Sequence, residues 1–95
     1  MTTVVGLLHL RLAIPLAMSL KDKRRAVKGF KDRLSAGHNV SVAEVGGLDD
    51  RRLAVLAVAM VGNEKRYIEG ALQAIVNAAS THRDMILLDR QVEWL

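Results

Sequence analysis

The sequence predicts an α+β fold in which two helices cover one face of a four-stranded antiparallel sheet. Three observations predict it: apolar segments with strand-like alternation, two segments with helical periodicity, and the order in which these segments follow one another. That order is β-α-β-β-α-β, and right-handed crossovers then place both helices on the same sheet face. This is the ferredoxin-like arrangement, and the length of 95 residues suits a single domain over residues 1–95.

The first strand and the first helix have clear sequence limits. Residues 3–14 alternate between two faces, and Pro15 ends the strand because it cannot donate to a sheet. Ser19 and Asp22 form an S-x-x-D pattern typical of a helix start, and Gly37 is a plausible stop after a helix that reaches about residue 36. The helix has one apolar stripe that we expect to be buried: Leu20, Val27, Phe30 and Leu34.

The rest of the chain supplies three strands and a second helix. Residues 39–45 alternate polar and β-branched side chains, which predicts a strand followed by a glycine-containing turn. Residues 53–61 are apolar at odd and even positions, so we expect this strand at the sheet centre, covered on both faces. A second helix is predicted over residues 63–80 with Asn63 as its cap, and residues 84–92 form the last strand.

Several classes of protein are disfavoured by composition. The chain has no cysteine, so disulfides, thiolate zinc sites and a cysteine nucleophile are all excluded. Its longest apolar run, residues 53–61, is far shorter than the roughly 20 residues of a membrane-spanning helix. No basic residue precedes Arg11, so the start does not resemble a secretory signal. We therefore expect a cytoplasmic protein.

Constellations of residues that carry catalysis or bind metal are also missing. His9, His38 and His82 have no partner at metal-ligand spacing. The connection over residues 14–18 contains no glycine and cannot wrap its amides around a phosphate. The carboxylates of the second strand and the following turn show no acid–base pairing, and we expect them to be solvated: Glu44, Asp49 and Asp50. The expectation is a protein that is not an enzyme, with no cofactor, no metal and no evident small-molecule substrate.

The positive charge is concentrated in one segment. Residues 21–33 hold seven cations and two acids, a net charge of +5, whereas the rest of the chain carries −1. Concentrated cations attract polyanions, although a charged helix flank is about as often simply a solvated surface. Because aromatic residues are 3% of the chain, any RNA contact should involve the backbone rather than stacked bases. The candidate nucleic-acid-binding residues are Lys21, Lys23, Arg24, Arg25, Lys28 and Lys31.

The predicted sheet has a second face that no helix covers. Val5 and Leu7 should place apolar groups there, and His9 and Arg11 should accompany them. Uncovered apolar sheet faces commonly pack against a partner, so we expect a homodimer through this face or docking on a larger molecule.

Two stretches have a recognisable pattern. Residues 19–25 read S-L-K-D-K-R-R, and residues 39–46 read N-V-S-V-A-E-V-G. Together they resemble the YlxP-like family of small bacterial proteins, a domain of unknown function, and the match in length and order covers essentially the whole chain. The resemblance implies a ferredoxin-like fold and a gene neighbourhood among translation and ribosome-maturation factors, with no established catalytic residues. Residues 49–52, D-D-R-R, stand where family members often have an aromatic residue.

The sequence thus leads to a first hypothesis and an alternative. The first is a non-enzymatic cytoplasmic protein that binds structured RNA or ribosomal particles through its basic first helix. The alternative is a dimeric interaction module that docks an acidic protein partner on the open sheet face or on the basic flank. Strong salt dependence of binding would favour the first hypothesis.

Overall fold

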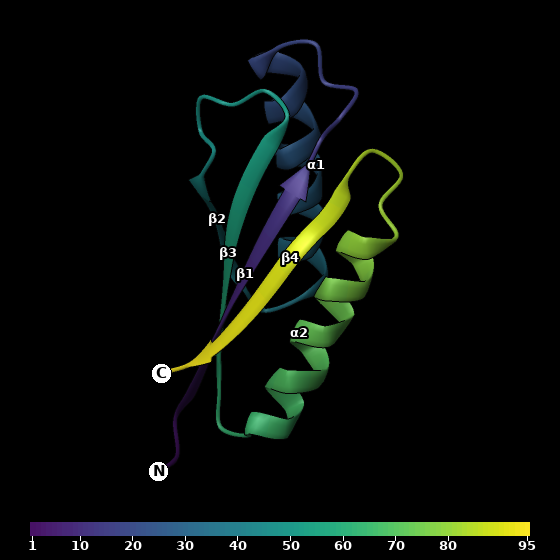
Figure 1. Cartoon of the computed structure of the whole chain (residues 1–95). Helices are drawn as coiled ribbons and strands as arrows, with labels where there is room; N and C mark the ends of the chain where they lie inside the picture. The colour runs from purple at the N-terminus through teal and green to yellow at the C-terminus, as the bar shows by residue number, and fades with distance from the viewer.

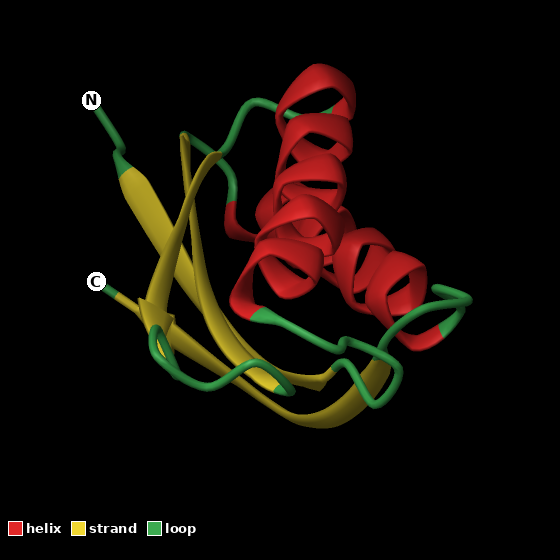
Figure 2. Ribbon diagram, turned by 90° about the horizontal axis from the view of Figure 1, so that it is seen from above, coloured by secondary structure: helices red, strands yellow, loops and turns green.

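The computed structural model describes all 95 residues and confirms the predicted order of elements. The elements are β1 (Val4–Ala13), α1 (Leu20–Gly37), β2 (Ser41–Gly46), β3 (Leu53–Gly62), α2 (Lys65–Ser80) and β4 (Ile86–Trp94). All strand pairs are antiparallel, and the sheet order is β2-β3-β1-β4 (Figure 1). Both helices lie on one face of the sheet, which leaves the other face without a covering layer (Figure 2). The architecture is ferredoxin-like.

The strand register decides which side chains meet the helices. β1 pairs with β3 without interruption from Val4 opposite Gly62 to Ala13 opposite Leu53. Leu8, Leu10 and Leu12 are fully buried beneath the helices, and the residues between them face the open side. The core contains 18 buried apolar side chains, drawn from β1, β3, both helices and the adjoining connections.

β3 lies at the centre of the sheet, as expected, but it is covered on one face only. Its residues alternate between fully buried and half-buried positions, with Ala54, Leu56 and Val58 beneath the helices. The expectation of cover on both faces was wrong for the single chain. The alternate positions, Val55, Ala57 and Ala59 among them, are half-buried apolar residues on the open face.

The first helix begins at the predicted cap. The Ser19 side-chain oxygen accepts a hydrogen bond of 3.1 Å from the Asp22 backbone N–H. The Asp22 carboxylate accepts a hydrogen bond of 3.1 Å from the Met18 N–H rather than from Ser19, so only half of the capping box forms. Gly37 is the last helical residue, and His38 is the cap at that end.

The second helix begins later than predicted. Its cap is Glu64, whose backbone is extended and whose side chain makes no capping hydrogen bond, so the assignment of Asn63 as the cap was wrong. The helix packs closely on β1 at Gly6, where an added Cβ would lie 2.9 Å from Ile68 and 3.0 Å from the Trp94 ring. β4 begins at Ile86, two residues after the predicted start, and ends at Trp94. Neither helix is long and apolar enough to cross a membrane.

Candidate nucleic-acid interface

The outward side of α1 carries most of the cations that the sequence singled out. At ~100° per residue, Lys31, Arg24, Lys28, Lys21 and Arg25 follow one another around an arc of about 120°. Four of them are exposed, and Lys31 is half-buried. The buried residues of the helix lie on the opposite side: Lys23, Val27, Phe30 and Leu34. The arc also contains the exposed carboxylate of Asp32, between Lys21 and Arg25. We call the five cations the basic flank.

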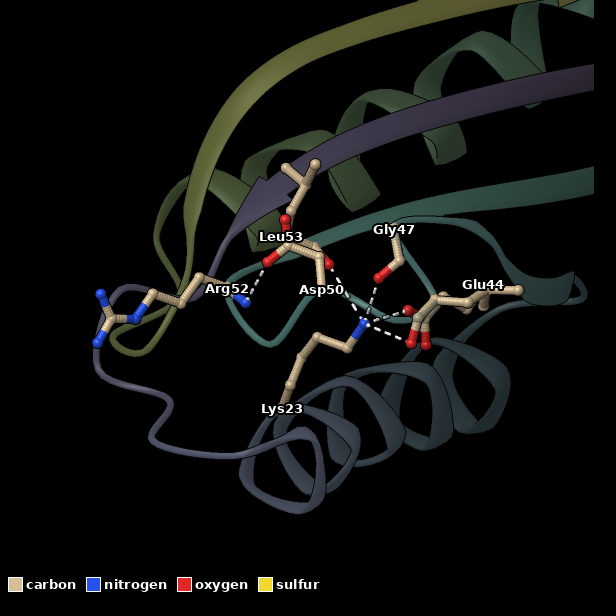
Figure 3. A network of polar contacts seen from close by, with 7 residues as sticks. Lys23, Glu44, Gly47, Asp50, Arg52 and Leu53 are labelled. Atoms are coloured by element: carbon tan, nitrogen blue, oxygen red, sulfur yellow. Dashed lines mark hydrogen bonds and ion pairs between the residues drawn. The ribbon is translucent and has the colours of Figure 1, made fainter.

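Lys23 does not belong to this surface, which corrects its assignment as a phosphate contact. Its side chain is fully buried, and its ammonium lies 2.8 Å from Glu44 Oε2 (Figure 3). The same ammonium donates to the backbone carbonyls of Gly47 at 2.7 Å and Leu53 at 3.2 Å. Every donor direction of the ammonium is taken up by the protein, so Lys23 has nothing to offer a ligand.

Local structure explains why Lys23 is enclosed. It lies one helical turn before Val27 and shares the buried stripe with it, so its stem enters the space between α1 and β2. Gly47 turns the chain after β2 with φ of +69°, and an added Cβ would lie 2.7 Å from the Leu53 carbonyl oxygen. This tight turn gathers carbonyl oxygens around the ammonium.

Glu44 was expected to be solvated, and this expectation was wrong. Its partner on β3 is Leu56, a fully buried residue, so both side chains lie on the helix side of the sheet. The Glu44 side chain is 14% exposed and is the only carboxylate paired with Lys23. The pair joins α1 to β2 and to the turn before β3.

The cations of the basic flank differ in how freely they can meet a partner. Lys28 pairs with Asp32 at 2.6 Å, with both side chains largely exposed, so this pair is well screened by water. Lys21, Arg24, Arg25 and Lys31 form no ion pair. Four unpaired cations therefore remain on one side of the helix.

Arg33 is a further exposed cation of α1 that the candidate set omitted. It lies outside the basic flank, on the side of the helix that faces the α2–β4 connection, with its guanidinium carbon 6.0 Å from the centre of the Phe30 ring. The sequence could have pointed to Arg33, because it lies in the segment of residues 21–33 that carries a net charge of +5. Arg25 and Arg33 are separated by eight residues, so both border the same side of the helix.

His82 lies beside Arg33 and has an altered acidity. Partial burial lowers the pKa of His82 below its usual 6.5, and the positive charge of Arg33 lowers it further. The ring meets Phe30 edge-on at 5.5 Å between centres. Nδ1 accepts a hydrogen bond of 3.0 Å from the Asp84 N–H, so the ring proton resides on Nε2.

The open sheet face holds His9 and Arg11, as expected. They line a shallow hollow with residues of β4, opposite Gln91 and Asp89 in the register. No group of three or more His, Asp or Glu side chains is placed to hold a metal ion.

These features define the class of protein: a small ferredoxin-like α+β domain with one basic helix. The family profile described as "Protein of unknown function (DUF503)" matches residues 5–92, and the chain belongs to this family. No curated protein matches the chain. Among solved structures, a match is "De novo designed protein Foldit4", with a TM-score of 0.55 and 17% sequence identity over 98% of this chain and 96% of that one. At this identity the likeness concerns the fold alone.

Proposed function

We propose that this protein is a non-enzymatic, cytoplasmic RNA-binding domain that contacts structured RNA or a ribosomal particle through the basic flank of α1. The observation that carries the proposal is the set of unpaired cations on that flank, Lys21, Arg24, Arg25 and Lys31, in a chain whose remaining charge is nearly balanced. The resemblance to YlxP-like proteins supports the same role.

The chemistry of the flank suits the phosphate backbone rather than the bases. Arginine and lysine side chains on a straight helix can each reach a phosphate, but such contacts orient a protein without reading sequence. The two large aromatic residues outside the core, Tyr67 and Trp94, lie on other elements, so the flank offers no stacking platform. Contact with about four phosphates predicts a log–log salt slope of about −3 to −4.

The test compares charge reversal on the basic flank with the same charge reversal elsewhere on the protein surface. The triple variant Lys21→Glu/Arg24→Glu/Lys28→Glu reverses the flank, and Arg51→Glu/Arg66→Glu/Arg83→Glu makes the same change in net charge at exposed positions elsewhere. Binding to ribosomal RNA and to ribosomal particles is measured across a salt series. We expect the flank variant to lose about tenfold or more in affinity and most of its salt slope, and the matched control to change little. Equal losses in both variants would contradict the proposal.

A second candidate function rests on the uncovered sheet face. On this face, Leu7, Val55, Ala57 and Ala59 are half-buried apolar residues of β1 and β3. His9 lies opposite Ala57, and Arg11 lies opposite Val55. We propose that a second copy covers this face, which would make the protein a homodimer; docking of an acidic protein there is the other form of this hypothesis.

The molar mass in solution tests the second candidate. Light scattering should give twice the chain mass for the unmodified protein and the chain mass for Ala57→Glu, which places a charge at the centre of the face. Ala36→Glu, an exposed position on α1, is the control and should remain a dimer. A monomer at every concentration would exclude the dimer.

A further inference from the structure

A groove runs along the side of α1 that carries Arg33. Its volume is about 550 Å³, and its walls come from the β1–α1 connection, from α1 and from the α2–β4 connection. Volumes of this size accommodate small organic ligands. Of the residues in the basic flank, Arg25 alone also lines this groove.

The helical residues in the middle of the groove are small. Ala26 and Gly29 lie between the two arginines, and an added Cβ at Gly29 would have no neighbour within 4 Å. Ile14 and Phe30, both buried in the core, provide the apolar base beneath them. A planar, largely apolar body could therefore rest against the helix without displacing any side chain.

The two ends of the groove carry positive charge and hydrogen-bond donors. Arg25 and Arg33 are eight residues apart, a rise of about 12 Å along the helix, and neither forms an ion pair. His82, with its proton on Nε2, stands at the Arg33 end. Two acids, Asp22 and Asp84, also line the groove. The Asp22 carboxylate accepts a hydrogen bond from the Met18 N–H, and the Asp84 carboxylate lies 3.8 Å from the Arg83 guanidinium.

We propose that this groove binds one nucleotide unit, with its phosphate at Arg25 and its base between the small floor and the Arg33–His82 end. Guanidinium groups pair with phosphate through two parallel hydrogen bonds, and they also stack on the planes of bases. The occupant is either a free mononucleotide or an unpaired nucleotide of a bound RNA. The second source rests on the proposed RNA-binding function, whereas the first does not.

Filling the floor separates this proposal from general phosphate binding. Gly29→Leu places a side chain in the groove at a position with open space, and Gly70→Leu makes the same change on α2, where an added Cβ is equally unobstructed. Both substitutions favour helix formation, so both variants should fold. Circular dichroism and thermal unfolding verify that they do.

The first arm of the test uses adenosine 5′-monophosphate as the probe, with adenosine and inorganic phosphate as comparisons, in calorimetric titrations. The second arm uses a single-stranded RNA oligonucleotide and a fully paired RNA duplex. For a free nucleotide, the monophosphate binds about tenfold more tightly than adenosine, and Gly29→Leu abolishes binding while Gly70→Leu preserves it. For an RNA nucleotide, Gly29→Leu weakens the single strand and leaves the duplex unchanged.

The outcomes distinguish this proposal from the proposed function. If the monophosphate does not bind and Gly29→Leu affects neither RNA, or affects both equally, the groove proposal is overturned while binding through the flank still stands. If the monophosphate binds in a groove-dependent way but RNA does not bind at all, the groove proposal holds and the proposed RNA function fails.

Discussion

The ammonium of Lys23, which is fully buried, and the carboxylate of Glu44, whose side chain is 14% exposed, lie 2.8 Å apart between α1 and β2. The lysine belongs to the most basic segment of the chain, yet it is the one cation there that the solvent cannot reach. The pair shows that two kinds of charge coexist on α1: an inward one that holds the helix to the sheet, and an outward one that is free for a partner.

Removing the inward charge should destabilise the fold. Lys23→Met leaves the Glu44 carboxylate without its charged partner and removes the ammonium donor from three backbone carbonyls. We expect a loss of about 3 kcal/mol in the free energy of unfolding. Urea titration followed by circular dichroism measures it. Lys28→Met, which breaks the exposed pair with Asp32, is the matched control and should cost no more than about 0.5 kcal/mol. Similar losses in the two variants would show that the Lys23 pair is not buried in solution.

The same two variants make a prediction about binding. Lys23→Met and Lys28→Met each remove one positive charge from α1, but only Lys28 lies on the outward surface. At about 50 mM salt, we expect the affinity for RNA to fall in Lys28→Met and to stay unchanged in folded Lys23→Met. A Lys23→Met protein that remains folded and loses as much affinity would indicate that overall charge, not its location, governs binding.

Stability should depend on pH through His82. Burial and the charge of Arg33 lower the pKa of His82 in the folded protein relative to the unfolded value near 6.5, so the folded state resists protonation. The contribution of His82 to the free energy of unfolding is therefore complete above about pH 6.5. It is lost as the pH falls through the lower pKa of His82 in the folded protein. Arg33 and Arg83 oppose the protonated ring, and Asp84 favours it.

Thermal unfolding between about pH 7.5 and about pH 5 checks this prediction, because the range spans the unperturbed histidine pKa near 6.5. The midpoint temperature should fall less in His82→Gln than in the unmodified protein. Identical pH profiles for the two proteins would contradict a lowered pKa.

Two glycines should respond in opposite directions to replacement by alanine. Gly29→Ala adds a methyl group where no atom lies within 4 Å and improves helix propensity, so we expect a gain of about 0.5–1 kcal/mol. Gly47→Ala forces a left-handed backbone on a residue with a Cβ, which would lie 2.7 Å from the Leu53 oxygen, so we expect a loss of about 2 kcal/mol. Midpoint temperatures measured by calorimetry decide both, and a loss in Gly29→Ala would show that its side of the helix is covered.

The fold was predictable from the sequence because each element has a strong local signal. The alternation of side chains between two faces predicts β1, and Ser19 predicts the start of α1. The order of the elements then favours the ferredoxin-like arrangement. The start of α2 was not predictable in the same way, since the chain passes through an extended Glu64 before turning, and no side chain caps it. Asn63 has the right chemistry for a cap but precedes the residue that occupies that position.

The candidate site was predictable in part. Charge alone groups Lys23 with its neighbours, whereas the helical period places it on the stripe of Val27 and Phe30. If the helical period is applied to the charged residues as well as the apolar ones, it predicts that Lys23 is buried. The alternation along β2 likewise predicts that the Glu44 side chain lies on the helix side of the sheet. The groove beside Arg33 has no comparable signal, because residues 14–17 and 82–84 meet α1 only through the tertiary fold.

The enclosure of Lys23 has a practical consequence for anyone who redesigns this molecule. Because the buried ammonium of Lys23 holds the helix to the β2–β3 hairpin, we expect residues on the outer arc of α1 to be replaceable while the orientation of the helix is preserved. The chain can thus serve as a small scaffold in which the residues on the outward side of α1 are redesigned.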